Sequence, residues 1–306
     1  MEIIKPGINI DLVGKMKIAF SASLAVIIIS ILSLMLHGGP NLGIDFAGGT
    51  LIQIKFSQDT DADGIRDALK TIDLGSSVIQ RFGYKDNNEF LIKTEKSSSE
   101  LKGLSSTIEE ALITTYGKEG FEVRRVEVVG PKVGKDLREK GMLAMLYAMI
   151  GILIYVTWRF ELRYAVGAIV ALAHDVIITV GIFSLLDKEF TLPIIAALLA
   201  IIGYSLNDTI VVYDRIRENI KGIKKQSLKD TINSSINQVL SRTVLTSVTT
   251  LLVVLALFFL GGAVIHDFAF AMLVGILVGT YSSIFIASPI VLVWETISPT
   301  KEKRRT

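Results

Sequence analysis

An acidic residue, Asp208, lies inside a long apolar segment, and a basic residue, Arg242, stands just before the next one. A charged side chain at the centre of a membrane-spanning helix costs about 2.5–3.5 kcal/mol, so such residues usually face a protein interior or a wet cavity. Arg242 on a neighbouring helix could approach Asp208, and small movements of the pair would change how strongly the carboxyl holds a proton. The pattern predicts an ion-coupling pair that binds and releases H⁺ or Na⁺.

Further polar residues share these apolar segments. Ser205 precedes Asp208 by three residues, whereas Ile201, Ile202 and Ile210 are expected to face lipid. We predict a set of residues that hydrate or hydrogen-bond the ion-coupling pair: Ser205, Asn207, Thr209, Thr246, His174 and Asp175.

A structural interpretation of these polar residues stays open. Intramembrane hydrogen bonds can hold helices together at about 0.6 kcal/mol each, and Arg242 could simply mark the membrane boundary. Recurrent small residues on the last apolar segment, Gly275, Gly279 and Ser283, predict close helix packing rather than chemistry.

The sequence offers little for catalysis. The chain has no Cys and three His, which excludes disulfides and thiolate metal sites. Residues 130–136 resemble a phosphate loop, but three residues rather than four separate the glycines, and Asp136 stands where Ser or Thr would bind magnesium. A net charge of +2 gives no footprint for nucleic acid. We therefore expect neither an enzyme nor a metal or cofactor site, and no nucleic-acid partner.

The chain as a whole is too apolar for a soluble domain. Half of its 306 residues are hydrophobic and 20% are charged, with a mean hydropathy of +0.52. About 20 apolar residues span a bilayer, and six runs are predicted to do so: 18–36, 142–158, 164–186, 192–212, 243–260 and 268–294. Lys and Arg concentrate in segments 1–17, 159–163, 213–242 and 295–306, which places both termini in the cytoplasm. Segment 213–242 is expected to contain a basic helix lying at the membrane surface.

The insertion 37–141 is then exported. Strand-like alternation at 50–56, 77–82, 89–94 and 122–129 and helical patterns at 63–72 and 98–116 give the order β-α-β-β-α-β. That order is typical of a ferredoxin-like domain. The predicted fold is a multi-span α-helical membrane protein of about six transmembrane helices with an inserted α+β ferredoxin-like extracytoplasmic domain.

Several segments together resemble the SecF family of the bacterial SecDF protein-export complex, which is related to RND exporters. They are 41–50, containing Asp45, Gly48 and Gly49 of a turn motif, 129–134, 203–219, 241–247 and 279–283. The resemblance covers essentially the whole chain and maps the family's membrane acid to Asp208 and its partner arginine to Arg242. It implies six RND-like spans in the bacterial inner membrane, a SecD partner of six more, docking on SecYEG, unfolded secretory clients, and coupling to a proton or sodium gradient.

Two other classes remain to be weighed. A small-molecule exporter of the RND type would need a larger exported region than about a hundred residues. A passive scaffold of the export machinery would tolerate neutralisation of Asp208 but not disruption of Gly275 and Gly279.

Overall fold

The computed structural model describes residues 9–83, 87–94, 103–222 and 227–297. Parts of the predicted segments 1–17, 98–116, 213–242 and 295–306 therefore lie outside the described residues. The chain divides into two compact units: one contains residues up to Asn41, Ala144–Lys188 and those from Pro193 on, and the other contains Leu42–Leu143 and Glu189–Leu192.

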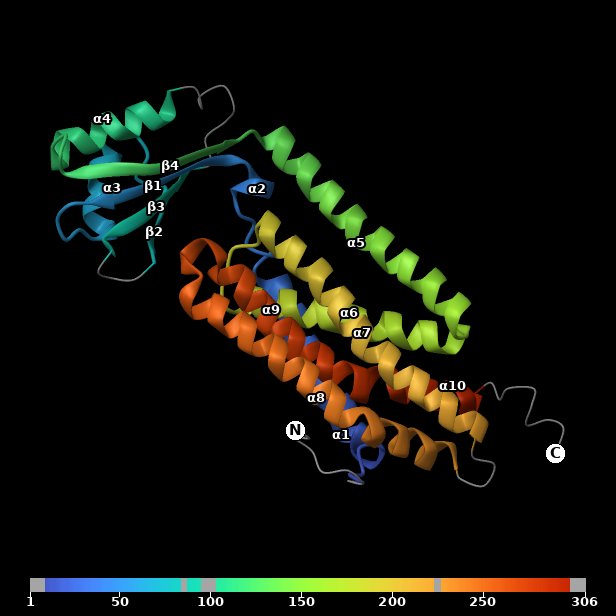
Figure 1. Cartoon of the computed structure of the whole chain (residues 1–306). Coiled ribbons are helices and arrows are strands. Elements are labelled where there is room, and N and C mark those ends of the chain that lie inside the picture. Colours follow the sequence, from blue (N-terminus) through green and yellow to red (C-terminus); the bar gives the residue numbers. More distant parts are fainter. Residues whose placement is uncertain (1–8, 84–86, 95–102, 223–226, 298–306) are drawn as a thin grey trace. The chain divides into compact units, whose positions relative to one another are not determined.

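The first unit is a helical bundle (Figure 1). Within the described residues, six helical segments are long and apolar enough to cross a membrane, as the sequence predicted. Their helices are α1 (Met16–Leu36, after a 3₁₀ turn at Val13–Lys15), α5 (Pro131–Arg159), α6 (Leu162–Leu185), α7 (Leu192–Gly222), α8 (Leu228–Leu260), α9 (Gly262–Ser282) and α10 (Ser288–Ile297). A π-helical turn, Ser283–Ala287, joins α9 to α10 within the last span.

The helices extend beyond the apolar runs. α5 begins at Pro131, eleven residues before the predicted span, because proline fits the first turn of a helix and charged residues continue it up to the apolar part. Within the described residues, segment 213–242 forms the end of α7 and the start of α8, and its location at the membrane surface stays a prediction. α7 continues to Gly222 and α8 already begins at Leu228, where Ser227 caps the first turn.

The bundle has inner and outer helices. In each span we consider the 18-residue stretch that is apolar enough to cross a membrane. In α6, α7 and the last span, 56%, 50% and 50% of this stretch is buried within the chain. The stretches of α1, α5 and α8 are buried by only 17%, 11% and 17%. The inner helices are therefore the ones that can hold polar groups away from lipid.

The second unit is a four-stranded antiparallel sheet with two helices. Its elements are α2 (Ile44–Ala47), β1 (Gly49–Phe56), α3 (Ala62–Lys70), β2 (Val78–Phe82), β3 (Glu89–Thr94), α4 (Leu104–Tyr116) and β4 (Phe121–Val129). From β1 on, this is the expected order of strands and helices, and the strands lie side by side as β2-β3-β1-β4 (Figure 1).

One hydrophobic core holds this unit together. Ile52, Ile54 and Phe56 alternate along β1 and so point to one face of the sheet, where they pack with Leu69 of α3 and Leu112 of α4. Both helices therefore cover the same face.

Candidate functional site

Asp175 lies near the middle of α6, about 20 Å from the first residue of the helix and about 15 Å from its last. Its side chain is completely buried. Helix α6 packs against α1 and α9, and Gly279 of α9 permits a close approach. A Cβ atom at Gly279 would lie 2.9 Å from Ser205 Cβ and 3.5 Å from Asp175 Oδ2. The sequence thus places small residues where a carboxyl must be enclosed.

Asp175 is the centre of a buried hydrogen-bond network. Ser205 of α7 donates to Asp175 Oδ2 at 2.6 Å, and Ser282 of α9 donates to the same oxygen at 2.9 Å. The other oxygen, Oδ1, lies 2.9 Å from His174 Nδ1, and His174 Nε2 lies 3.1 Å from Ser23 Oγ of α1. Four helices meet through this one carboxyl.

The placement of Ser205 differs from the sequence-based expectation. Ser205 was expected to share the polar face of Asp208, but its hydroxyl bonds Asp175 instead. Ile201 and Ile202, expected to face lipid, are buried, and Ile201 lies against Gly275. This side of α7 faces helices of the bundle rather than lipid.

Asp208 lies on α7, about 24 Å from the first residue of the helix. Its side chain is only 2% exposed, and its Oδ2 atom has no hydrogen-bond partner among the residues that the structure describes. Two side chains of α8 lie close enough to interact with the Asp208 carboxyl: the Ser247 hydroxyl and the Arg242 guanidinium. Arg242 is exposed, and no ion pair joins it to Asp208 within the described part of the chain.

A second polar cluster includes Ser247, the hydroxyl close to Asp208. Tyr204 donates to Ser247 Oγ at 3.3 Å, and Ser247 Oγ lies 2.7 Å from Thr280 Oγ1. Hydroxyl groups therefore link α7, α8 and α9 beside Asp208.

The remaining predicted polar residues contribute less. Asn207 is exposed. Thr209 is buried, and its hydroxyl has no partner among the described residues. Thr246 bonds carbonyls of its own helix, at Arg242 and Thr243. None of the three joins Asp208 to another helix through a hydrogen bond in the described structure.

The small residues of the last span lie at helix contacts. A Cβ atom at Gly275 would come within 2.3 Å of the Ile201 side chain, so α9 meets α7 at both Gly275 and Gly279. Ser283 is buried at the start of the π-helical turn and donates to the Thr280 carbonyl at 2.9 Å.

The predicted turn motif has a structural role in the second unit. Asp45 Oδ2 accepts a hydrogen bond of 2.8 Å from the backbone N–H of Leu192, the first residue of α7. Gly48 has a φ angle of +80°, and a Cβ atom on it would lie 2.9 Å from Pro131 Cα. Gly49 begins β1 with a φ of +130°. The paired glycines therefore provide a backbone conformation and a close approach that side chains oppose.

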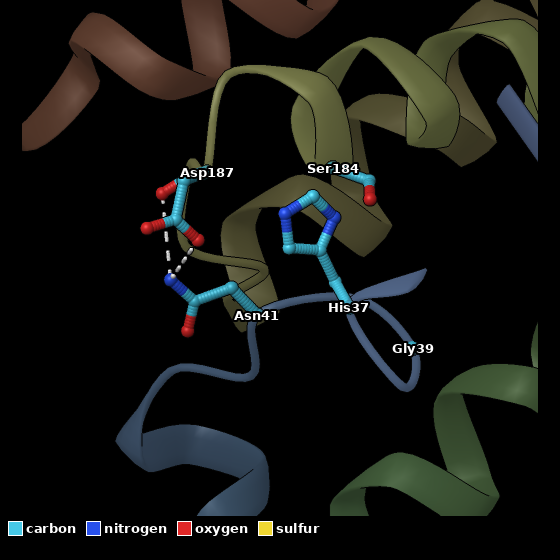
Figure 2. Close-up of a pocket in the computed structure, with 5 residues that line it drawn as sticks. All are labelled: His37, Gly39, Asn41, Ser184 and Asp187. Carbon is cyan, nitrogen blue, oxygen red and sulfur yellow. Dashed lines mark hydrogen bonds between the residues drawn. The ribbon is translucent and has the colours of Figure 1, made fainter. Parts of the chain in front are cut away.

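A polar cavity of about 250 Å³ lies at one end of α1 and α6, lined by His37, Gly39, Asn41, Ser184 and Asp187. Figure 2 shows the Asn41 amide against Asp187 and the His37 ring next to Ser184. Asn41 Nδ2 donates to Asp187 Oδ1 at 3.1 Å. The positive-inside pattern predicts that this end faces the outside.

Sequence reasoning missed the serines of α1 and the hydroxyls of α9. Ser23, Ser30, Ser33 and His37 follow one another at intervals of seven, three and four, which is the spacing of one helix face. That spacing was available in the sequence as a signal. In the described residues no group of three or more His, Asp and Glu could hold a metal ion.

Comparisons with known proteins identify relatives over the whole chain. The model of the SecD/SecF GG motif matches residues 33–60, and that of protein export membrane protein SecD/SecF, C-terminal, matches residues 108–297. The protein translocase subunit SecF of Magnetococcus marinus is 52% identical over 309 residues, covering 100% of this chain and 98% of the relative. That of Calditerrivibrio nitroreducens is 52% identical over 294 residues, covering 95% and 96%.

Solved structures give the same result. The chain is similar to SecDF of Thermus thermophilus, described as a translocon-associated membrane protein, with a TM-score of 0.84 and 40% identity. The match covers 95% of this chain and 39% of the SecDF chain. SecDF in a super-membrane-facing form matches all of this chain and 41% of its own, with a TM-score of 0.71 and 38% identity. This chain therefore spans about two fifths of the length of those SecDF chains.

Proposed function

The chain belongs to the SecD/SecF family of protein-export membrane proteins, and from that premise we propose that it couples a cation gradient to the export of unfolded proteins. It is a multi-pass membrane protein and a transport component of the translocase type. In the proposed cycle Asp208 takes up and releases the cation, and the resulting change in helix packing moves the exported unit.

The observation that carries this proposal is the buried carboxyl of Asp208 with an unbonded oxygen. An acid within an apolar span costs about 2.5–3.5 kcal/mol, and a group that served only to hold helices together would use its hydrogen bonds. Asp208 Oδ2 has none among the described residues, while the Ser247 hydroxyl lies close to this carboxyl and contacts the hydroxyls of Tyr204 and Thr280. Such a site can accept either H⁺ or Na⁺.

The exposed surface supports a larger assembly. Arg242 and Thr249 are exposed on α8, and the apolar stretch of α5 is buried by only 11% within the chain. A guanidinium within or beside an apolar span is expected to face protein or water rather than lipid. We propose that a SecD-type subunit with six further spans covers this surface, that the pair docks on SecYEG, and that both termini are cytoplasmic.

The names of the relatives weigh against export of small molecules, because these relatives are protein translocase subunits. A passive scaffold remains the competing function within protein export. Neutralising Asp208 separates the two, since a scaffold does not need its charge.

The test is Asp208→Asn in the assembled complex, in membrane vesicles on which proton and sodium gradients are imposed separately. We expect gradient-driven stimulation of precursor export to be lost while complex assembly is unchanged. Asp136→Asn, an exposed acid on the charged part of α5, is the matched control and should keep the stimulation. Stimulation that survives in Asp208→Asn would reject ion coupling at this residue.

A further inference from the structure

The outer helix α1 buries mainly serines, whereas a helix packed by apolar contacts would bury its apolar side chains. Its buried residues are Met16, Ser23, Ser30 and Ser33, while Ile28, Ile29 and Leu32 on other faces are exposed. The three serines face α6. We call this contact, from Ser23 to Ser33 on α1 and from His174 to Ser184 on α6, the α1–α6 seam.

The seam has a constant register. Ser33 Oγ lies 2.9 Å from Ser184 Oγ, and Ser23 Oγ lies 3.1 Å from His174 Nε2, each pair separated by 151 positions. Gly181 stands opposite Ser30 with the same offset, and a Cβ atom on Gly181 would lie 2.1 Å from Ser30 Oγ. The two helices therefore run parallel and approach closely along a line of hydroxyl groups.

Ser30 shows that this line is more than a packing contact. Its side chain is 0% exposed, and its hydroxyl has no partner in the described structure. An unbonded hydroxyl in a buried position is costly unless water completes its bonds. The polar cavity of His37, Asn41, Ser184 and Asp187 lies at the end of the same seam, so water has a source there.

At the other end, the hydrogen bonds determine how many protons the His174–Asp175 pair holds. Tyr281 must donate its hydrogen to the Ala19 carbonyl at 2.7 Å, because a carbonyl only accepts. Ser23 therefore donates to the Tyr281 oxygen at 3.0 Å and has no hydrogen left for His174. His174 Nε2 must carry a hydrogen and donate it to Ser23.

A second proton must then lie between His174 Nδ1 and Asp175 Oδ1, which are 2.9 Å apart. Either the imidazole or the carboxyl carries it, and the pair is neutral in both cases. Asp175 Oδ2 is occupied by the hydroxyls of Ser205 and Ser282. The pair is loaded with a proton in this conformation.

We propose that the α1–α6 seam is a hydrated path by which protons from the cavity reach the His174–Asp175 pair, a second proton-carrying site beside the Asp208 site. The proposal rests on the proposed ion coupling and specifies its ion along this path. Imidazole can take a proton at one nitrogen and release one from the other, whereas a sodium ion cannot pass through the ring.

The transfer step balances. When the carboxyl has released its proton to water, the neutral ring still carries its hydrogen on Nε2, and it must first change to the tautomer with hydrogen on Nδ1. That ring accepts a proton at Nε2, becomes an imidazolium and releases the Nδ1 proton to Asp175 Oδ1. One proton has then entered the ring, one has left it, and the loaded pair is restored.

One apolar turn separates the two ends of the seam. Ile27 and Ile178 share the same offset and lie between Ser30 and Ser23, which are about 10 Å apart along the helix. A hydrophobic constriction of this kind conducts only when it is wet. In the proposed path this turn must become wet before a proton can pass, so we expect proton entry to depend on conformation.

The test uses the absence of cysteine from the chain. Ser33→Cys, Ser30→Cys and Ile29→Cys are introduced singly into the full complex in intact cells, and silver ion is added outside. Thiols left unreacted are then counted with a fluorescent maleimide after unfolding. Serine and cysteine are close in size, and Ile29 is exposed on another face of α1 than the three serines.

We expect Ser30→Cys to react nearly as fast as Ser33→Cys and about tenfold or more faster than Ile29→Cys, because the bilayer core holds no water. Ser30→Cys reacting as slowly as Ile29→Cys overturns the path. This readout does not depend on export, so a failed path and a failed function of Asp208 are distinguishable.

A second measurement examines the His174–Asp175 pair itself. His174→Gln keeps a group that can hydrogen-bond but cannot relay protons. Proton-driven stimulation of export should fall about tenfold or more in His174→Gln, and its dependence on outside pH should flatten, while assembly of the complex is retained. Ser30→Ala should lower the stimulation and Ser30→Thr should restore it. An unchanged pH profile in His174→Gln rejects the relay.

Discussion

Ser205 and Asp208 stand three positions apart on α7, yet their side chains join different neighbours. Ser205 donates a hydrogen bond to Asp175 on α6. The Asp208 carboxyl instead interacts with Ser247 and Arg242 of α8. At 100° per residue, three positions place the two side chains about 60° apart around the helix, enough for separate helices to contact each. One helix therefore carries a residue of each polar cluster.

Ser205→Ala should destabilise the bundle modestly. The substitution removes a 2.6 Å hydrogen bond to a buried carboxyl without changing the packing volume much. Interhelical hydrogen bonds in membranes contribute about 0.6 kcal/mol on average and at most about 1.7 kcal/mol, so we expect a loss in that range. Thermal unfolding in detergent measures it. Asn207→Ala, at an exposed position of the same helix, should unfold as the unaltered chain does, and equal losses in both variants would contradict the role of the bond.

Gly279→Ala should separate α9 from α7. Its new methyl group would lie 2.9 Å from Ser205 Cβ and 3.5 Å from Asp175 Oδ2. We expect a loss of about 1–3 kcal/mol in the free energy of unfolding and reduced export. Gly203→Ala is the matched control, since a Cβ there meets no atom within 4 Å. Helix propensity alone should make Gly203→Ala neutral or up to about 1 kcal/mol more stable. A neutral Gly279→Ala would show that the two helices are loosely packed.

Gly48→Ala should disturb the turn that precedes β1. The position combines a φ of +80° with a Cβ contact of 2.9 Å to Pro131 Cα. Gly38→Ala isolates the first effect, because Gly38 has a φ of +72° but no atom within 4 Å of a Cβ. A positive φ costs a non-glycine residue about 1–2 kcal/mol, so Gly38→Ala should lose about that amount and Gly48→Ala clearly more. Thermal unfolding of the whole chain measures both losses, and equal losses in the two variants would exclude the clash.

Tyr116 should make the second unit sensitive to alkaline pH. Burial raises the pKa of this phenol above its ordinary value of 10.0, and Asp61 and Asp67 add to the effect. A raised pKa means that folding favours the protonated form, so its contribution is fully present below pH 10.0 and is lost as the pH rises through the folded value. Tyr116→Phe keeps the ring against Phe56 and should flatten the alkaline part of the stability profile. A profile unchanged by that substitution would assign the loss to other groups.

The spans and the sheet could be predicted because their signals are local. A run of about 20 apolar residues marks a span, and alternation marks a strand such as Glu89–Thr94, whose bounds were predicted as they occur. The full lengths of α5 and α7 could not be predicted this way. Hydropathy marks only the apolar run that can cross the membrane, and both helices continue beyond that run.

The candidate site was only partly predictable. Insertion cost singled out Asp208 and Asp175 as residues that need a protein environment. It could not decide which acid Ser205 contacts, because that depends on how α7 is rotated between α6 and α8. The roles of Asp208 and Arg242 in coupling stay predictions.

The constant offset of 151 between α1 and α6 has a mechanical consequence. Sliding α1 along α6 by a single residue, about 1.5 Å, would move Ser23, Ser30 and Ser33 away from their α6 partners at the same time. These partners are His174, Gly181 and Ser184. Because these contacts share one offset, a slide that breaks one of them breaks the others. We therefore expect the α1–α6 seam to be either fully formed or fully lost.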